Sequence, residues 1–513
     1  RGQGIRPTTA SAGGDDGGAA APDTSAAARA AAPAGRGGGA APAGAPAGAP
    51  AGSPQPAAAG PVRDRTNWDA PFVMSPHNAD RIYFASQFVY RSDDRGDTWN
   101  RISPDLSRQL NRDTLPIMGK VWPRGSVALN ASTTDLSNVV AIDESPVMEG
   151  LLWVGTDDGL VQVSEDGGKN WRRIETFPGV PKFTYVSDVH ASPRDANTVF
   201  VTLNNWQRGD YAPYIVRSAD RGRTWTNISG NLPAKHDVWT IAQDHVNGEL
   251  LFVGTEFGLF TSVDGGKQYV QIKGGLPVTQ VRDLTLHKRE NDVVMATFGR
   301  GFYVLDDYSS LREITPQTMQ EPARLFPLRH AYSFVPGGVA PAGAAGSLAI
   351  SGNFSTPNPP VGAWITYNVK DSIPATQKLV LTINDNSGKQ IRRCELDRTP
   401  GLRRLAWNLN SDPVAPDSAT VRRILSQLPA GTDTTAAARQ PANVLQSCSL
   451  ATGGFGGGGG GGGFGGGGLA ALRGQPQRVP AGLYTASIGM LNGTTVTPVG
   501  PSQSFMVLPL LQP

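Results

Sequence analysis

One eight-residue pattern, Ser-x-Asp-x-Gly-x-x-aromatic, occurs four times in this chain. Ser and Asp side chains can close a tight turn by hydrogen bonding to nearby backbone groups, and Gly supplies the positive φ that such a turn needs. The recurrence predicts a fold built from repeated supersecondary units. The pattern residues are Ser92, Asp94, Gly96, Trp99, Ser164, Asp166, Gly168, Trp171, Ser218, Asp220, Gly222, Trp225, Ser262, Asp264, Gly266 and Tyr269.

Each copy of the pattern lies within a longer unit that predicts four short β-strands. Runs such as LLWVGT and GLVQVS predict the second and third strands, and the fourth strand contains the aromatic residue. Four short strands separated by turn signals are typical of a β-propeller blade. We expect five blades between residues 66 and 313, each containing its own four strands, and we favour an arc of a larger ring. The fifth blade has lost the pattern, since residues 304–308 read VLDDY.

The pattern aspartates have a structural and a functional interpretation. In the structural one, each Asp and its Ser hold a turn together while the aromatic residue covers it. In the functional one, these aspartates are catalytic or bind calcium. Four equivalent aspartates on separate blades lie too far apart to share one site, so we favour the structural interpretation.

The repeats resemble BNR/Asp-box repeats. The segments LLWVGTDDGLVQVSEDGGKNW and LLFVGTEFGLFTSVDGGKQY are similar to the second half of bacterial sortilin-like BNR-repeat proteins, which are themselves similar to glycoside hydrolase family 74. The resemblance implies further repeats upstream, so that RGQGIRP would be the tail of a preceding blade. It also implies two functions, because sortilin-type propellers bind peptides and family 74 propellers cut glucans with two aspartates. Neither catalytic aspartate can be matched to a position of this chain by motif.

Composition divides the chain further. Of the first 60 residues, 44 are Ala, Gly or Pro, which predicts a disordered linker over residues 1–64. The propeller is expected over 65–315, a linker over 316–360, and a β-sandwich over 361–513 that is interrupted by a disordered Gly-rich insertion, 411–478. The sandwich resembles the immunoglobulin-like domain of flagellar hook-capping proteins at Asn384 to Gly388, Gly401 to Leu409 and Pro480 to Tyr484. The predicted class is all-β: a propeller followed by an immunoglobulin-like sandwich.

Three residues of the C-terminal region leave alternatives open. Trp407 is either a core residue, which we favour, or an aromatic that contacts a ligand. Cys394 and Cys448 could form a disulfide in an oxidising compartment. Cys394 could equally be a buried apolar residue.

Charge and residue spacing exclude several classes of function. The 46 Lys and Arg residues are scattered among 43 Asp and Glu residues, without the basic stripe that is typical of nucleic-acid binding. No apolar run approaches the length of a membrane span. The Cys and His spacings match no metal motif, so we expect neither a metal nor another cofactor. We expect a secreted, periplasmic or cell-surface protein.

Strand alternation predicts where a site could lie. If successive strands of a blade run up and down, the aspartate turns share one face with the turns between strands one and two. The turns between strands two and three share the opposite face, which we call the loop face, with the links between blades. The loop face carries seven candidate ligand-binding residues: Asp157, Asp158, Trp206, Asp210, Tyr211, Glu256 and Arg300. The links add Tyr185 and Trp239, among others.

Aromatic planes, carboxylates and a guanidinium suit a sugar or a peptide. The alternative is that Asp157 and Glu256 merely favour tight turns before glycine. We favour a secreted binding or scaffold protein that holds a peptide, a glycan or another protein. The alternative function is a glycoside hydrolase that acts on a β-glucan, which needs two carboxyl groups across a cleft.

Overall fold

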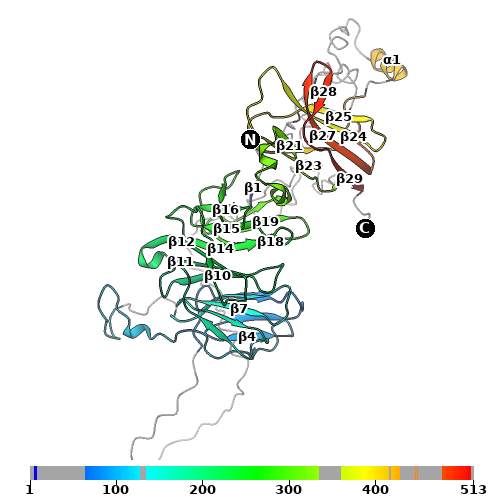
Figure 1. Cartoon of the computed structure of the whole chain (residues 1–513). Helices are drawn as coiled ribbons and strands as arrows, with labels where there is room; N and C mark the ends of the chain where they lie inside the picture. The colour runs from blue at the N-terminus through cyan, green and yellow to red at the C-terminus, as the bar shows by residue number, and fades with distance from the viewer. Residues whose placement is uncertain are drawn as a thin grey trace, which may run out of the picture. The chain divides into compact units, whose positions relative to one another are not determined.

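The computed structural model describes residues 5–8, 64–127, 135–333, 360–414, 417–427, 445, 448 and 476–509. Most of the predicted linker 1–64, residues 334–359 of the predicted linker and most of the Gly-rich insertion lie outside these residues. The described helices include none with the length and apolar character needed to cross a bilayer. In the described region the chain is all-β, as predicted (Figure 1).

Five four-stranded antiparallel sheets form the propeller blades. Four of them follow the chain in simple sequence order, so each blade is a meander with its first strand innermost. Their strands are β2 (Phe72–Met74), β3 (Ile82–Ala85), β4 (Val89–Ser92) and β5 (Asn100–Arg101); β6 (Val139–Glu144), β7 (Leu152–Thr156), β8 (Val161–Ser164) and β9 (Arg172–Ile174); β10 (Tyr185–Ala191), β11 (Val199–Asn205), β12 (Asp210–Ser218) and β13 (Thr226–Asn227); β14 (Val238–Gln243), β15 (Leu251–Thr255), β16 (Gly258–Ser262) and β17 (Val270–Ile272).

The fifth blade is assembled differently. It contains β18 (Val281–His287), β19 (Asp292–Thr297) and β20 (Phe302–Leu305), and its outermost strand is β1 (Ile5–Thr8). Ile5 pairs with Leu305 in an antiparallel register. The prediction that every blade contains its own four strands is therefore wrong here, because the start of the chain occupies the place of the fourth strand. The chain instead continues into the 3-10 helix η4 (Tyr308–Glu313).

The cores lie between neighbouring blades, since the buried apolar side chains of each cluster come from two adjacent sheets. The VGT sequences of β7 and β15 show why a glycine recurs there. A Cβ built on Gly155 would lie 2.3 Å from Cγ1 of Val186 in the next blade, and one on Gly254 would lie 2.7 Å from the carbonyl oxygen of Val281. These glycines let the inner strand of the following blade approach closely.

The four aspartate patterns fold into equivalent turns. In the first, Ser92 Oγ donates to Asp94 Oδ1 (2.7 Å) and accepts from the Gly96 N–H (2.7 Å), while the Thr98 N–H donates to Asp94 Oδ1 (2.9 Å). Hydrogen bonds to Ser92 and Thr98 hold the pKa of Asp94 down at about 2. This geometry supports a structural role for the pattern.

The C-terminal region is a sandwich of two sheets around one apolar core. Its first strands, β21 (Ala323–Leu325) and β22 (Ala331–Ser333), lie within the stretch predicted as a linker, so the sandwich begins earlier than residue 361. One sheet contains β21 (Ala323–Leu325), β23 (Ala363–Val369) and β26 (Gly401–Trp407). The other contains β22 (Ala331–Ser333), β29 (Gln503–Pro509), β27 (Gly482–Asn492), β24 (Lys378–Asp385), β25 (Gln390–Glu395) and β28 (Thr495–Pro498).

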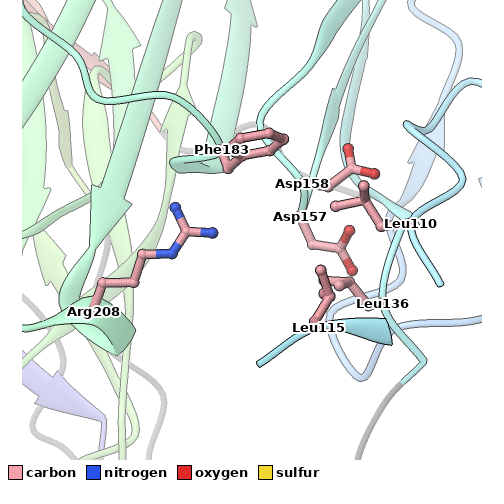
Figure 2. Close-up of a pocket in the computed structure, with 7 residues that line it drawn as sticks. All are labelled: Leu110, Leu115, Leu136, Asp157, Asp158, Phe183 and Arg208. Atoms are coloured by element: carbon pink, nitrogen blue, oxygen red, sulfur yellow. The ribbon is translucent and has the colours of Figure 1, made fainter. Parts of the chain in front are cut away.

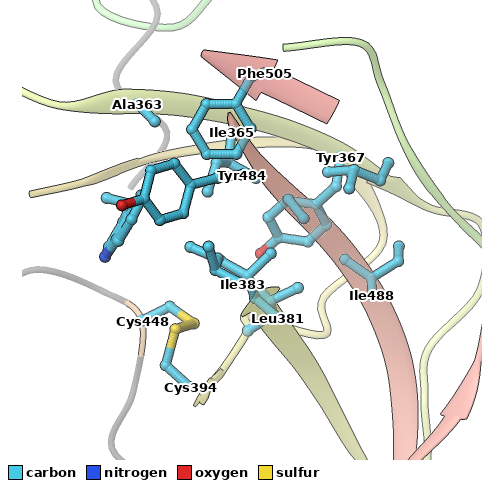
Figure 3. Packing of buried hydrophobic residues seen from close by; sticks show 14 of the residues in the cluster. Ala363, Ile365, Tyr367, Leu381, Ile383, Cys394, Cys448, Tyr484, Ile488 and Phe505 are labelled. Atoms are coloured by element: carbon cyan, nitrogen blue, oxygen red, sulfur yellow. A yellow bond between two sulfur atoms is a disulfide. The ribbon is translucent and has the colours of Figure 1, made fainter. Parts of the chain in front are cut away.

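The open alternatives for the C-terminal region are decided by this core. Trp407 is buried against Tyr484 and Phe505, so it is a core residue. A disulfide joins Cys394 to Cys448 at the edge of the same core (Figure 3). The predicted insertion also contains a helix, α1 (Ser418–Ser426), so it is not irregular throughout.

Candidate functional site

The hydrogen bonds between turns bear out the two-face arrangement. On one face, the Gly167 N–H in an aspartate turn donates to the carbonyl of Gly150 between strands one and two. On the loop face, the Asp157 N–H donates to the carbonyl of Asn138 in a blade link, and the Glu256 N–H donates to that of Asp237. Turns and links therefore lie together on the loop face, as strand alternation predicts.

A pocket opens on this face beside Asp157 (Figure 2). It contains about 440 Å³ of empty space, part of it open to solvent. Four segments build it: the long link between β5 and β6, the β7–β8 turn, the link before β10, and the 3-10 helix η3 (Trp206–Arg208). The lining residues are Leu110, Leu115, Leu136, Asp157, Asp158, Phe183 and Arg208.

The two adjacent aspartates in this pocket have different surroundings. Asp158 is buried and accepts hydrogen bonds from Thr156 Oγ1 (2.6 Å) and the Arg108 N–H (2.8 Å). Asp157 is half-buried and accepts from the Asn138 N–H (2.8 Å) and from Asn67 Nδ2 (3.2 Å). Burial, assisted by the charge of Asp158, raises the pKa of Asp157 to about 6 despite these bonds. Asp157 therefore keeps a proton at mildly acidic pH.

A second group of polar side chains lies next to Asp157. Tyr185 OH donates to Asp69 Oδ2 (3.3 Å), and Arg282 forms an ion pair with the same carboxylate (3.2 Å). Burial raises the pKa of Tyr185, with further contributions from the charges of Asp69 and Asp157. The guanidinium of Arg282 stacks on Trp239, 3.9 Å from the ring centroid. Tyr185 thus hydrogen-bonds to one carboxyl group and feels the charge of a second, which comes from a distant part of the chain.

Three further acids gather where the third and fourth blades meet. Glu256 accepts from Trp239 Nε1 (3.1 Å) and Gln280 Nε2 (2.5 Å). Burial and the nearby charges of Glu256 and Asp210 raise the pKa of Asp237 to about 6. Asp210 itself accepts from Tyr214 OH (2.7 Å). This group extends the polar surface from Arg282 across the loop face.

The seven predicted residues therefore divide into groups. Asp157 and Asp158 line the pocket, and Asp210 and Glu256 surround Asp237. Trp206 is 43% exposed in η3, which also contains Arg208, and Tyr211 is 49% exposed near the start of β12 rather than in a loop. Arg300 lies exposed in the β19–β20 turn and belongs to neither group. That these seven residues bind a ligand stays a prediction.

The described residues include no group of three or more His, Cys, Asp or Glu side chains arranged to hold a metal ion. The groups present at this site are carboxyl, phenol and guanidinium groups together with aromatic planes.

Sequence reasoning missed the segment Asn67-Trp68-Asp69. It precedes the first blade, and the rule that links lie on the loop face would have placed it there. Asn67 binds Asp157, Asp69 binds both Tyr185 and Arg282, and the Trp68 side chain is 84% exposed. The apolar pocket wall was also missed, because Leu110 and Leu115 lie in a link with no periodic pattern.

Comparisons with known proteins find partial matches to two curated xyloglucanases. No family model matches the chain. A xyloglucanase from Hypocrea jecorina is 26% identical over 132 residues, which is 23% of this chain and 14% of that enzyme. An oligoxyloglucan-reducing end-specific xyloglucanase from Emericella nidulans is 25% identical over 174 residues, 31% of this chain and 17% of that enzyme.

Among solved structures, an ancestral GH74 enzyme is similar with 14% identity and a TM-score of 0.35, covering 70% of this chain and 40% of that one. The chain thus spans less than half of these relatives. Both curated relatives are glycoside hydrolases, so the comparisons favour that class over the binding scaffold that the sequence favoured. The chain is similar to xyloglucanases and forms propeller blades.

Proposed function

We propose that the loop face is the active site of a glycoside hydrolase that acts on a β-glucan, with Asp157 as the general acid. One observation carries the proposal: Asp157 is a pocket-lining carboxyl group whose pKa of about 6 keeps it protonated in mildly acidic solution. Glycosidases need such an acid to protonate the leaving oxygen, and they need a second carboxylate.

Asp69 is the candidate for the second carboxylate. Its side chain is half-exposed and forms an ion pair with Arg282 (3.2 Å). Asn67 joins the two acids, since it donates to Asp157 and its Oδ1 accepts from the Asp69 N–H (3.0 Å). In the reaction, Asp157 would donate a proton to the departing sugar oxygen, and Asp69 would accept a proton from the attacking water.

The exposed aromatic residues support a place for the sugar chain. Trp68 adjoins Asp69, Trp206 lies in the same 3-10 helix as the pocket-lining Arg208, and Tyr211 lies near the start of β12. Flat aromatic faces stack on the C–H faces of sugar rings, and they also suit peptide side chains. A secreted glycan- or peptide-binding scaffold is therefore the second candidate. The Cys394–Cys448 disulfide supports an extracytoplasmic location for either one.

Reducing-sugar release from soluble xyloglucan and mixed-linkage β-glucan tests the first candidate. We expect hydrolysis by the wild type and at least 100-fold slower hydrolysis by Asp157→Asn and Asp69→Asn, because general acid–base groups typically contribute 10²–10⁴-fold. Asp371→Asn, in the sandwich, is the matched control, since the side chain of Asp371 is 82% exposed.

Affinity electrophoresis on the same glucans separates the two candidates. The glucan in the gel should slow the migration of a protein that binds it. If it slows the wild type but not Trp68→Ala, and no sugar is released in the hydrolysis assay, then the protein is a binding scaffold and not a hydrolase. If both aspartate variants hydrolyse the glucan as fast as Asp371→Asn, the assignment of the site is wrong.

A further inference from the structure

The pocket beside Asp157 has a wall that the hydrolysis of a glucan does not use. Four of its seven lining side chains are apolar, namely those of Leu110, Leu115, Leu136 and Phe183. The carboxylate of Asp158 is already engaged by Thr156 and Arg108. A sugar ring bears hydroxyl groups all around its rim and would leave many of them unpaired against this wall.

The apolar wall is held in place by its surroundings. Phe183 has a φ of +63°, and a Cβ on Gly159 would lie 2.8 Å from the Phe183 Cα, so the glycine makes room for this backbone. The Arg108 guanidinium lies over the Phe183 ring, 4.8 Å from the centroid of the ring. Arg108 is in turn fixed by Glu175 (2.8 Å). The wall is therefore not a chance collection of mobile side chains.

Asp157 lines the pocket together with this wall and also accepts a hydrogen bond from Asn67, which links it to Asp69 and Tyr185. A glycoside has the same division: a hydroxyl-rich sugar on one side of the glycosidic oxygen and a leaving group on the other. The general acid must lie beside that oxygen. If the sugar lies among the polar residues, the leaving group occupies the pocket.

We infer that the pocket receives an apolar leaving group, so that the site accepts aryl or long-chain alkyl β-glucosides. This inference rests on the proposed function and extends it from glucans to glycosides with an apolar aglycone. In the reaction, the bond from the anomeric carbon to the aglycone oxygen breaks and that oxygen takes the proton of Asp157. Water adds to the anomeric carbon and gives a proton to Asp69. The products are the free sugar and a phenol or alcohol.

Calorimetric binding of two non-hydrolysable thioglycosides tests the inference without requiring hydrolysis. The probes are p-nitrophenyl 1-thio-β-D-glucoside and methyl 1-thio-β-D-glucoside, which differ only in the aglycone. We expect the aryl compound to bind at least about tenfold more tightly, since burying a ring removes a large apolar area from water. Leu115→Ser should remove most of that preference.

Met118→Ser is the matched control, because Met118 belongs to the same link and is 97% exposed. It should keep the full preference for the aryl probe. Equal affinities for the two probes, or an unchanged preference in Leu115→Ser, would overturn the inference even if glucan is hydrolysed. If the aryl probe binds more tightly but no glucan is hydrolysed, the assignment of the pocket is supported and the proposed glucanase activity is not.

Discussion

The close approach of neighbouring blades at Gly155 can be tested by adding one carbon atom. In Gly155→Ala, the new Cβ would lie 2.3 Å from Val186 Cγ1 and 2.8 Å from Val186 Cβ. Neither distance is tolerable, and Val186 is fully buried on an inner strand with a β-branched side chain that has few other rotamers. The backbone of one blade must therefore move away from the next.

Overpacking of this kind costs about 1–3 kcal/mol in protein cores. Replacing Gly with Ala also restricts the unfolded chain, which returns about 0.4–1 kcal/mol. We therefore expect Gly155→Ala to lower the free energy of unfolding by about 1–2 kcal/mol, measured by urea denaturation followed by tryptophan fluorescence. Gly125→Ala is the control, since a Cβ there meets nothing within 4 Å.

The double variant Gly155→Ala/Val186→Ala isolates the contact. Shortening Val186 removes the methyl group that the new Cβ would strike, so the double variant should be less destabilised than the sum of the two single variants. A coupling of about 1 kcal/mol is expected for residues in direct contact. Strict additivity, or a Gly155→Ala variant as stable as Gly125→Ala, would refute the account of blade packing.

Three further predictions concern stability. Asp220→Ala should lower the melting temperature, because Asp220 accepts from Ser218 Oγ (2.8 Å) and the Thr224 N–H (2.8 Å); Asp220→Asn should recover part of the loss. Burial raises the pKa of Asp143 to about 8 and that of Asp188 to about 7 in the folded protein. The stability that these two carboxyl groups contribute is therefore complete below about pH 4 and is lost as the pH rises toward 8, because the unfolded chain ionises first. The urea concentration at the unfolding midpoint should therefore depend less on pH in Asp188→Asn than in the wild type between pH 4 and 8. Reducing the Cys394–Cys448 disulfide should lower the melting temperature of the sandwich, and Cys394→Ser should abolish the effect of the reductant.

Local features of the fold were predictable from the sequence. The bonds of the Ser92–Asp94 turn span two to four residues, so the pattern contains all of their partners. Strand alternation needs only the order of strands, and it placed Asp157 and Glu256 on the same face. The burial of Trp407 followed from its place on a strand of the sandwich.

The missed features depend on residues far apart in the chain. The resemblance implied that RGQGIRP is the tail of a preceding blade, whereas Ile5 pairs with Leu305 and completes the fifth blade. Asp69 and Arg282 are 213 residues apart, and only the folding of the whole series of blades brings them together. The candidate site depends on this contact. Sequence reasoning therefore identified Asp157 as a site residue but missed Asp69.

The pH dependence of glucan hydrolysis tests the role of Asp157 most directly. A general acid is active only while protonated, and burial raises the pKa of Asp157 to about 6. We expect kcat/KM of the wild type on soluble β-glucan to fall about tenfold for each pH unit above about 6. The residual kcat/KM of Asp157→Asn should not show this decrease. A wild-type kcat/KM that stays constant or rises between pH 6 and 8 would contradict this role of Asp157.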